Sequence, residues 1–336
     1  MMEASSIGLT RGKVLTALTL SIGVIAPWLA GLATGHAMHG AVAAFGAYLL
    51  IVSFPRLPAS GRWKVLTASS LIISLFATVG GYVVLGSLAF FVLALAAAMA
   101  QGIGELAGGY LRLPVALGAL AYFLSVGQVP AGEQLVYGLF FFFGALWGAG
   151  LVYACIPGVT DEAKRSAEPL LKESGRRRFL GSMALVSLLG GFAASFSPGS
   201  HPCWLTAAGL RVMKPTRRET IYRMKTRGLG TVLGAATGGL LLGLSPMPLL
   251  HASLVGLLVF CMLLIGAKRY GVWTFCLTAV ALAFDLSPEA GALVLGTNRV
   301  LMTIVGIGIA VLALPLLSRG AKAENTRPQS STAPPG

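Results

Sequence analysis

The amino-acid sequence predicts an all-α, polytopic membrane protein with about 12 transmembrane helices arranged as two parallel six-helix halves. Its 336 residues are 56% hydrophobic and only 11% charged. Apolar runs of roughly 16 to 22 residues recur along the chain, which suits helices that cross a hydrocarbon core about 30 Å thick. No segment shows the alternating pattern of an outer-membrane barrel. These observations exclude a water-soluble domain.

Apolar runs bounded by charge, glycine or proline give the positions of the helices. In the first half we expect helices at residues 14–34, 39–54, 65–80, 84–101, 113–127 and 134–154. In the second half we expect them at residues 179–196, 202–215, 228–244, 248–266, 271–286 and 299–317. Arg11 and Lys13 precede the first run as in a signal peptide, but the run is longer than a signal-peptide core. We therefore expect it to remain as the first transmembrane helix.

A polar segment divides the expected helices into two sets of six. The predicted division is a first transmembrane half at 1–156, a charged cytoplasmic linker at 157–178, a second transmembrane half at 179–317 and a disordered cytoplasmic tail at 318–336. The halves share weak similarity, since the pair Gly80-Gly81 is echoed by Gly238-Gly239. With six helices each, the repeats would share one orientation and be related by an axis along the membrane normal.

Positive charge falls on one side of this layout. All but one of the 25 lysines and arginines lie in segments that the expected helices leave on the same side, the exception being Arg299. Cytoplasmic loops are rich in lysine and arginine, so both termini are predicted to be cytoplasmic. A net charge of +14 can also attract nucleic acid. Membrane orientation explains the charge here, and we predict no nucleic-acid partner.

Seven of these basic residues follow one another between residues 211 and 227, opposed only by Glu219. Arg211 would lie roughly 14 Å along a helix that begins near Pro202, close to mid-bilayer, where a charge normally lines a cavity or meets a partner. Alternatively, the helix ends at Pro215 and Arg211 extends to the cytoplasmic headgroups. The sequence favours neither placement.

Three further charged residues stand in apolar surroundings. Arg299 is expected to open the last helix and Asp285 to close the preceding one, so the two can pair across their loop. An ion pair or an interfacial anchor is the favoured role of Arg299, ahead of substrate contact. Glu105 is flanked by glycines, which indicates an ordinary cytoplasmic turn; if buried, it is a candidate proton carrier.

The sequence contains no catalytic or metal-binding pattern. Its four cysteines lack CxxC spacing and are expected to be reduced structural thiols. No Ser/His/Asp set and no HExxH motif stands out. Gly230, Gly234 and Gly238, spaced four apart, indicate close helix packing rather than a phosphate-binding loop. We therefore predict no enzymatic activity, no cofactor and no bound metal.

Motifs of the second half occur in a recognisable order: Trp204 at a helix start, Pro215-Thr216 in a basic loop, Arg227 with Gly230-Thr231 and Gly234, and Arg299 with Gly306. Over residues 201–316 this order resembles the fusaric-acid-resistance-like (FUSC) membrane domain. The first half is similar only in helix pattern and lacks the R-x-x-G-T-x-x-G signature. The linker, with about 22 residues, is also shorter than the cytoplasmic domain of many long family members.

The resemblance implies a bacterial inner-membrane transporter, with members associated with efflux of aromatic carboxylic acids and distant plant relatives that act as organic-anion channels. We expect a secondary transporter that exports small organic anions and is driven by the proton gradient. The candidate residues are Arg211, Arg223, Arg227 and Arg299 for the substrate pathway, because guanidinium pairs with carboxylate, and Glu105 and Asp285 for proton coupling.

Two alternatives stay open at this point. One is a passive organic-anion channel, which needs no proton carrier. The other is a non-transporting scaffold whose basic loop binds anionic lipid or a partner, since clustered lysine and arginine attract such headgroups. The expected partners are membrane lipid and the organic anion. Self-association and a periplasmic adaptor protein are both compatible with the sequence.

Overall fold

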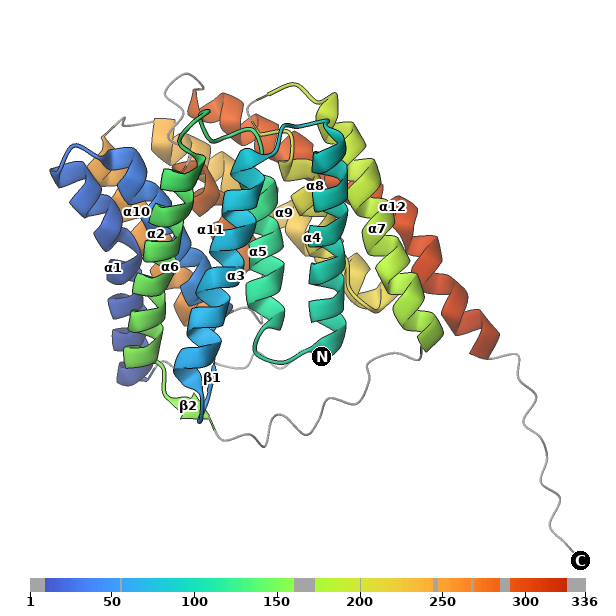
Figure 1. Cartoon of the computed structure of the whole chain (residues 1–336), viewed down its shortest axis with the longest axis horizontal. Coiled ribbons are helices and arrows are strands. Elements are labelled where there is room, and N and C mark those ends of the chain that lie inside the picture. Colours follow the sequence, from blue (N-terminus) through green and yellow to red (C-terminus); the bar gives the residue numbers. More distant parts are fainter. Residues whose placement is uncertain are drawn as a thin grey trace, which may run out of the picture.

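The structure is a computed structural model of the protein. It describes residues 10–54, 56–159, 173–199, 201–243, 247–266, 269–284 and 291–324. Within these ranges the chain forms a bundle of twelve helices, with one pair of two-residue parallel strands (Figure 1). The helices are α1 (Arg11–Ala33), α2 (Ala37–Ser53), α3 (Arg62–Tyr82), α4 (Leu88–Ala107), α5 (Arg112–Ser125), α6 (Gln134–Cys155), α7 (Glu173–Ser195), α8 (Trp204–Val212), α9 (Arg217–Gly243), α10 (Pro248–Ile265), α11 (Tyr270–Ala283) and α12 (Ala292–Glu324). The strands are β1 (Leu57–Pro58) and β2 (Gly158–Val159).

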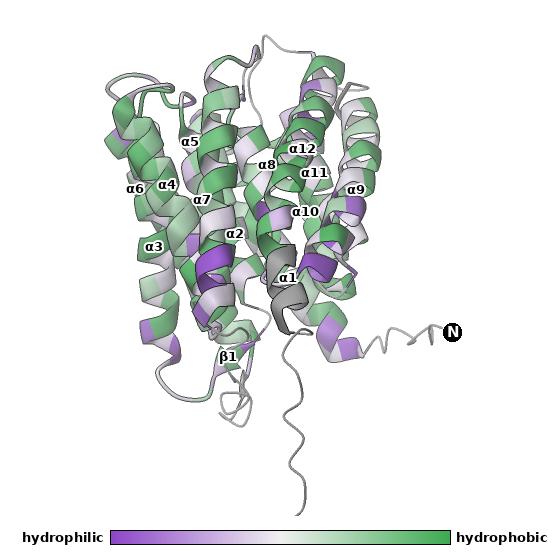
Figure 2. Cartoon of the chain, turned by 90° about the vertical axis from the view of Figure 1, so that its right-hand side faces the viewer, coloured by the Kyte–Doolittle hydropathy of each residue, from purple (hydrophilic) through white to green (hydrophobic). Residues whose placement is uncertain are grey.

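Seven of the described helices are long and apolar enough to cross a membrane: α1, α3, α4, α6, α7, α10 and the Leu293–Leu317 part of α12. α2, α5 and α11 are apolar but shorter, and α8 has only nine residues. Figure 2 shows hydrophobic residues along most of the bundle and hydrophilic residues gathered toward one end. The predicted all-α, multi-pass membrane protein is confirmed at this level; twelve membrane crossings stay a prediction.

Helix packing repeats along the chain. α2 packs on α6 as α8 packs on α12, α3 packs on α5 as α9 packs on α11, and α3 packs on α6 as α9 packs on α12. The two sets of six meet where α1 contacts α10 and where α4 contacts α7. The pattern is the one expected of two similar six-helix units with the same orientation, and a symmetry axis along the membrane normal stays a prediction.

The helix boundaries around the basic run differ from those predicted. α8 ends at Val212 rather than near 215, and α9 begins at Arg217 rather than at 228. The hydroxyl of Thr216 accepts a hydrogen bond from the backbone N–H of Glu219 at 3.3 Å, and so caps the first turn of α9. A Thr with Glu three residues later is a helix-start signature that hydropathy alone does not detect. Arg227 therefore lies in the third turn of α9 and does not open the helix.

Other helices also extend beyond their apolar runs. α7 begins at Glu173, inside the predicted linker 157–178, where Arg177 and Glu173 form an i,i+4 ion pair at 3.0 Å. α12 begins at Ala292, so Arg299 lies within it instead of opening it, and it continues to Glu324, inside the predicted disordered tail. Charged first and last turns project from the apolar segment, so boundaries drawn from hydropathy stop too early. Residues 160–172 and 325–336 lie outside the described residues.

Three glycines of α9 allow it to approach α11 closely. A Cβ on Gly230 would lie 2.6 Å from the carbonyl oxygen of Gly271, and one on Gly234 would meet the carbonyl oxygen of Phe275. A Cβ on Gly238 would lie 3.2 Å from the Cα of Ala279. Small residues at this spacing let two helix backbones pack together in a membrane.

We expect Gly234→Ala to lower the free energy of unfolding by about 1 to 3 kcal/mol, because the added methyl group would push α11 away. An SDS unfolding titration of the purified protein measures this change. Gly308 of α12 has open space where its Cβ would be placed, so Gly308→Ala is the matched control and should not destabilise the fold. Equal unfolding of the two variants would contradict the close contact at Gly234.

Candidate functional site

A cavity of about 770 Å³ opens between the two sets of six helices. Both sets line it: α1, α2, α4, α5 and the end of α6 of the first, and α8, α9, α10 and α11 of the second. Its volume is within the range of sites that enclose a small organic ligand. The cavity reaches the end of the bundle at which α1, α5 and α9 begin, with Arg11, Arg112 and Arg217. We call this end the basic end.

The charge of the cavity wall is strongly positive. Among the described residues that line it, Glu105 is the one acid. The basic lining residues are Lys13, Arg56, Arg112, Arg211, Lys214 and Arg223. A recess walled by one sign of charge raises the local concentration of ions of the opposite sign. The cavity is therefore suited to anions.

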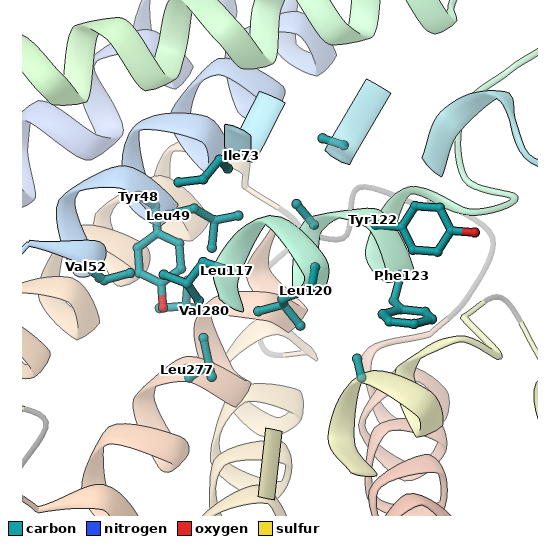
Figure 3. Close-up of a cluster of buried hydrophobic side chains, with 14 of the residues drawn as sticks. Tyr48, Leu49, Val52, Ile73, Leu117, Leu120, Tyr122, Phe123, Leu277 and Val280 are labelled. Carbon is teal, nitrogen blue, oxygen red and sulfur yellow. The ribbon is translucent and has the colours of Figure 1, made fainter. Parts of the chain in front are cut away.

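Farther from the basic end, the cavity becomes apolar and aromatic. Figure 3 shows the Tyr48 ring among Leu49, Val52 and Leu117, with Leu277 on α11 opposite. All five line the cavity. The Tyr48 hydroxyl donates a weak hydrogen bond to the sulfur of Met262 at 3.7 Å, so its polar atom is already used. A ligand that enters this part meets hydrocarbon and an aromatic face.

Arginines gather around Tyr270 at the start of α11. The guanidinium of Arg223 lies over its ring at 4.4 Å, and Arg211 and Arg227 also interact with it electrostatically. Arg223 forms a longer ion pair with Glu219 at 3.4 Å. Arg211 occupies the last turn of α8 and lines the cavity, and its Nε is buried without a hydrogen-bond partner in the described part of the chain. The structure thus places Arg211 in a cavity wall, with one buried donor left unpaired.

Glu105 links the two sets of helices across the cavity wall. Its carboxylate accepts from Arg112 at 2.6 and 3.1 Å and from the ammonium of Lys214 at 2.7 Å. One turn earlier on α4, the amide of Gln101 donates to the carbonyl of Leu210 at 3.0 Å. Glu105 is buried in the last turn of α4 and does not lie in an exposed turn, the role the sequence favoured for it. These bonds join α4 and α5 to the segment between α8 and α9.

Lys214 lies in the connection between α8 and α9, where 7% of the residue is exposed. Burial lowers the pKa of its ammonium group to about 8, although the attraction of Glu105 acts in the opposite direction. The ammonium group therefore loses its charge as the pH rises through that value. The positive charge of the cavity falls accordingly in alkaline solution.

We expect Glu105→Gln to lower the free energy of unfolding by about 3 kcal/mol, because it leaves the buried Lys214 without its counter-charge. Thermal unfolding in detergent is the measurement. Glu219→Gln is the matched control, since its pair with Arg223 is long and Glu219 is 43% exposed, and exposed pairs contribute about 1 kcal/mol or less. A Glu105 variant as stable as the control would mean that the bridge adds nothing to the packing of the two sets.

The other two arginines of the predicted pathway do not line the cavity. Arg227 is buried in α9 beside Tyr270, and Arg299 is buried in α12 with its guanidinium over the Trp204 ring at 4.4 Å. Asp285, the expected partner of Arg299 and a candidate proton carrier, lies outside the described residues. The predicted pathway is thus divided between the cavity wall, with Arg211 and Arg223, and the interior of the second half.

Comparison with known families bears on this half of the chain. Residues 185–313 match a family model described as fusaric acid resistance protein-like. This part of the second half is therefore similar to the fusaric acid resistance protein-like family. No curated protein and no solved structure matches the chain. The match overlaps the segment 201–316 that resembles the family in sequence, and together with the apolar helices it indicates a multi-pass membrane transporter.

The cavity contains residues of both halves that sequence reasoning missed. Lys214 lies within the basic run between residues 211 and 227 and was not singled out, and Tyr270 lies just before the helix expected at residues 271–286. Arg112 was counted only among the basic residues on one side of the membrane. It follows Glu105 by seven residues, and the short turn between α4 and α5 brings the two together. The Glu–Arg spacing was visible in the sequence, whereas the contact with Lys214 depends on packing between the halves.

Proposed function

We propose that the protein exports small organic anions, such as aromatic carboxylic acids, across a bacterial inner membrane. The cavity carries this proposal, because it combines six basic residues and one acid with an apolar, aromatic interior. A carboxylate would bind at Arg211, Lys214 and Arg223, near the basic end. The apolar body of the same molecule would lie against Tyr48 and Leu277.

The chemistry of the guanidinium groups supports an anion as the substrate. A buried donor without a partner costs about 1 to 3 kcal/mol, and a carboxylate at Arg211 would remove that cost. Arginine offers two parallel N–H donors that match the two oxygens of a carboxylate. A cationic substrate would face repulsion from six charges, and a neutral one would leave the donors unused.

Membrane orientation supports export as the direction of transport. Lysine- and arginine-rich segments stay in the cytoplasm, so we infer that the basic end and both termini are cytoplasmic. The cavity then opens toward the cytoplasm and collects anions from it, as an exporter requires. Glu105 is our candidate for proton coupling, since it is the acid of the cavity wall within the described residues.

The test is uptake of labelled benzoate into inverted membrane vesicles that contain the protein, with and without an imposed pH gradient. Vesicles from cells that lack the protein correct for diffusion of protonated benzoic acid, and labelled benzyl alcohol serves as the uncharged analogue. We expect saturable benzoate uptake that the pH gradient increases, and no protein-dependent uptake of the alcohol. Saturable flux that ignores the gradient would indicate a passive anion channel. Uptake equal to that of the control vesicles would favour the scaffold and reject transport of this class of acid.

A further inference from the structure

Arg299 is a buried cation that does not line the cavity. It is 3% exposed, lies in the second turn of α12 and forms no ion pair with an acid among the described residues. The preceding residue, Asn298, packs against Gly199 in the connection between α7 and α8. Arg299 therefore lies toward the end of the bundle opposite the basic end.

Its surroundings leave two donors on the edge of the guanidinium unpaired. The Trp204 ring covers one face of the group at 4.4 Å, and the imidazole of His201 stacks on the same indole at 4.3 Å with an interplanar angle of 8°. Nε and Nη1 of Arg299 are buried and have no hydrogen-bond partner in the described part of the chain. One turn along α12, the buried hydroxyl of Thr303 is also without a partner. A guanidinium stacked by its face keeps the planar N–H edge that pairs with a carboxylate.

The equivalent place in the first half is satisfied internally. Gly306 of α12 packs against the carbonyl of Leu205 as Gly144 of α6 packs against that of Ala43, which sets the equivalence of the two helices. Arg299 precedes Gly306 by seven residues, and Tyr137 precedes Gly144 by the same number. The Tyr137 hydroxyl is 2.9 Å from the hydroxyl of Ser125 and hydrogen-bonded to it. The unpaired donors are thus a property of the second half and not of the repeat.

A row of like charges connects this place to the cavity. Arg223, which lines the cavity, and Arg227 are one turn apart on α9, and α9 packs against both α8, which carries Arg211, and α12, which carries Arg299. Arg227 is 2% exposed and its Nε has no hydrogen-bond partner among the described residues. Buried positive charges repel one another, and an anion between them removes that repulsion. The row gives a carboxylate successive partners from the cavity into the second half.

We propose that Arg299, with Trp204 and Thr303, forms a second carboxylate-binding site, which an organic anion reaches from the cavity past Arg227. This inference rests on the proposed transport of organic anions. The first site, formed by Arg211, Lys214 and Arg223 in the cavity wall, binds the anion near the basic end. The second holds it near the opposite end, between α8, α9 and α12, before release.

Two tryptophans allow the sites to be observed separately. Trp273 lines the cavity and Trp204 belongs to the second site. The experiment is a benzoate titration of tryptophan emission from purified protein in nanodiscs, repeated with Trp273→Phe and with Trp204→Phe. We expect two saturable components, one lost in each variant.

We then expect Arg299→Gln to weaken the Trp204 component by about tenfold or more, because the carboxylate loses its charged partner. The Trp273 component should change less than about twofold, and Arg218→Gln, an exposed residue of α9, should change neither. Arg299→Lys, which keeps the charge without the planar fork, should be intermediate and replaces the glutamine variant if that one does not assemble. If the protein with all its tryptophans shows the component that depends on Trp273 but none that depends on Trp204, the second site is overturned and the first stands. Loss of both components would reject the proposed function.

Discussion

We expect Arg211→Gln to lower benzoate transport about 100-fold at low substrate concentration, with membrane insertion unchanged. Paired hydrogen bonds between a guanidinium and a carboxylate in a buried site contribute about 3 kcal/mol, and every 1.4 kcal/mol is about tenfold in affinity. Arg211 is at the end of α8, lines the cavity and has an unused buried donor. Initial rates of labelled benzoate uptake into inverted vesicles measure the effect.

Arg218→Gln provides the control, since it removes the same charge from an exposed position of α9 outside the main cavity. We expect it to keep most of the transport activity. Because Arg211 and Arg223 interact, their double variant should lose less than the sum of the two single losses. Wild-type transport by Arg211→Gln, at equal protein levels, would mean that substrate does not bind at this end of α8.

Hydropathy predicts much of the fold, and the errors of that prediction occur at charged helix ends. The apolar runs locate all twelve described helices, because a membrane helix must be apolar over most of its length. The first eleven residues of α9 were assigned to a loop because they carry most of the basic run. Basic residues are good helix formers, and the cap at Thr216 shows that the helix can begin within the charged segment. The basic run was thus wrongly taken as the end of a helix, whereas the side of the membrane that its charge predicts stays a prediction.

The cavity was less predictable than the helices. Arg211 was selected from its expected place in a membrane helix and Arg223 as a guanidinium that can pair with a carboxylate, and both line it. Glu105 and Lys214, which bond across the two halves, are separated by more than one hundred residues, so no local pattern brings them together. Arg299 was paired with Asp285 by proximity in sequence, whereas its aromatic partner, Trp204, comes from a different helix. Contacts between elements distant in sequence depend on packing, which a single sequence does not specify.

An aromatic cluster lies beside the cavity on the side away from the basic end. Phe284, which follows α11, stacks on Trp28 of α1 at 5.2 Å and lies 5.3 Å from Phe45 and 6.3 Å from Tyr48, both of α2. Tyr48 lines the cavity, so the cluster lies directly beyond it. These contacts join the first set of helices to the second. A hydrophobic constriction of this kind excludes water and ions from the space beyond it.

We expect Phe284→Ala to convert the transporter into a leak, with downhill benzoate flux about 100-fold above wild type. Three aromatic contacts of about 1 kcal/mol each hold the closed arrangement, and their loss shifts the balance toward the open one by about 3 kcal/mol. The leak should not depend on a pH gradient, because passage no longer requires the conformational step that coupling acts on. Efflux of preloaded benzoate from proteoliposomes measures it, and Phe192→Ala on α7, at a residue that is 60% exposed, is the matched control. If Phe284→Ala shows no increase in benzoate efflux while Arg299→Gln blocks the flux, the anion leaves through the second half and not along the interface between the halves. Flux that rises in Phe284→Ala and is indifferent to Arg299 would place the exit at that interface.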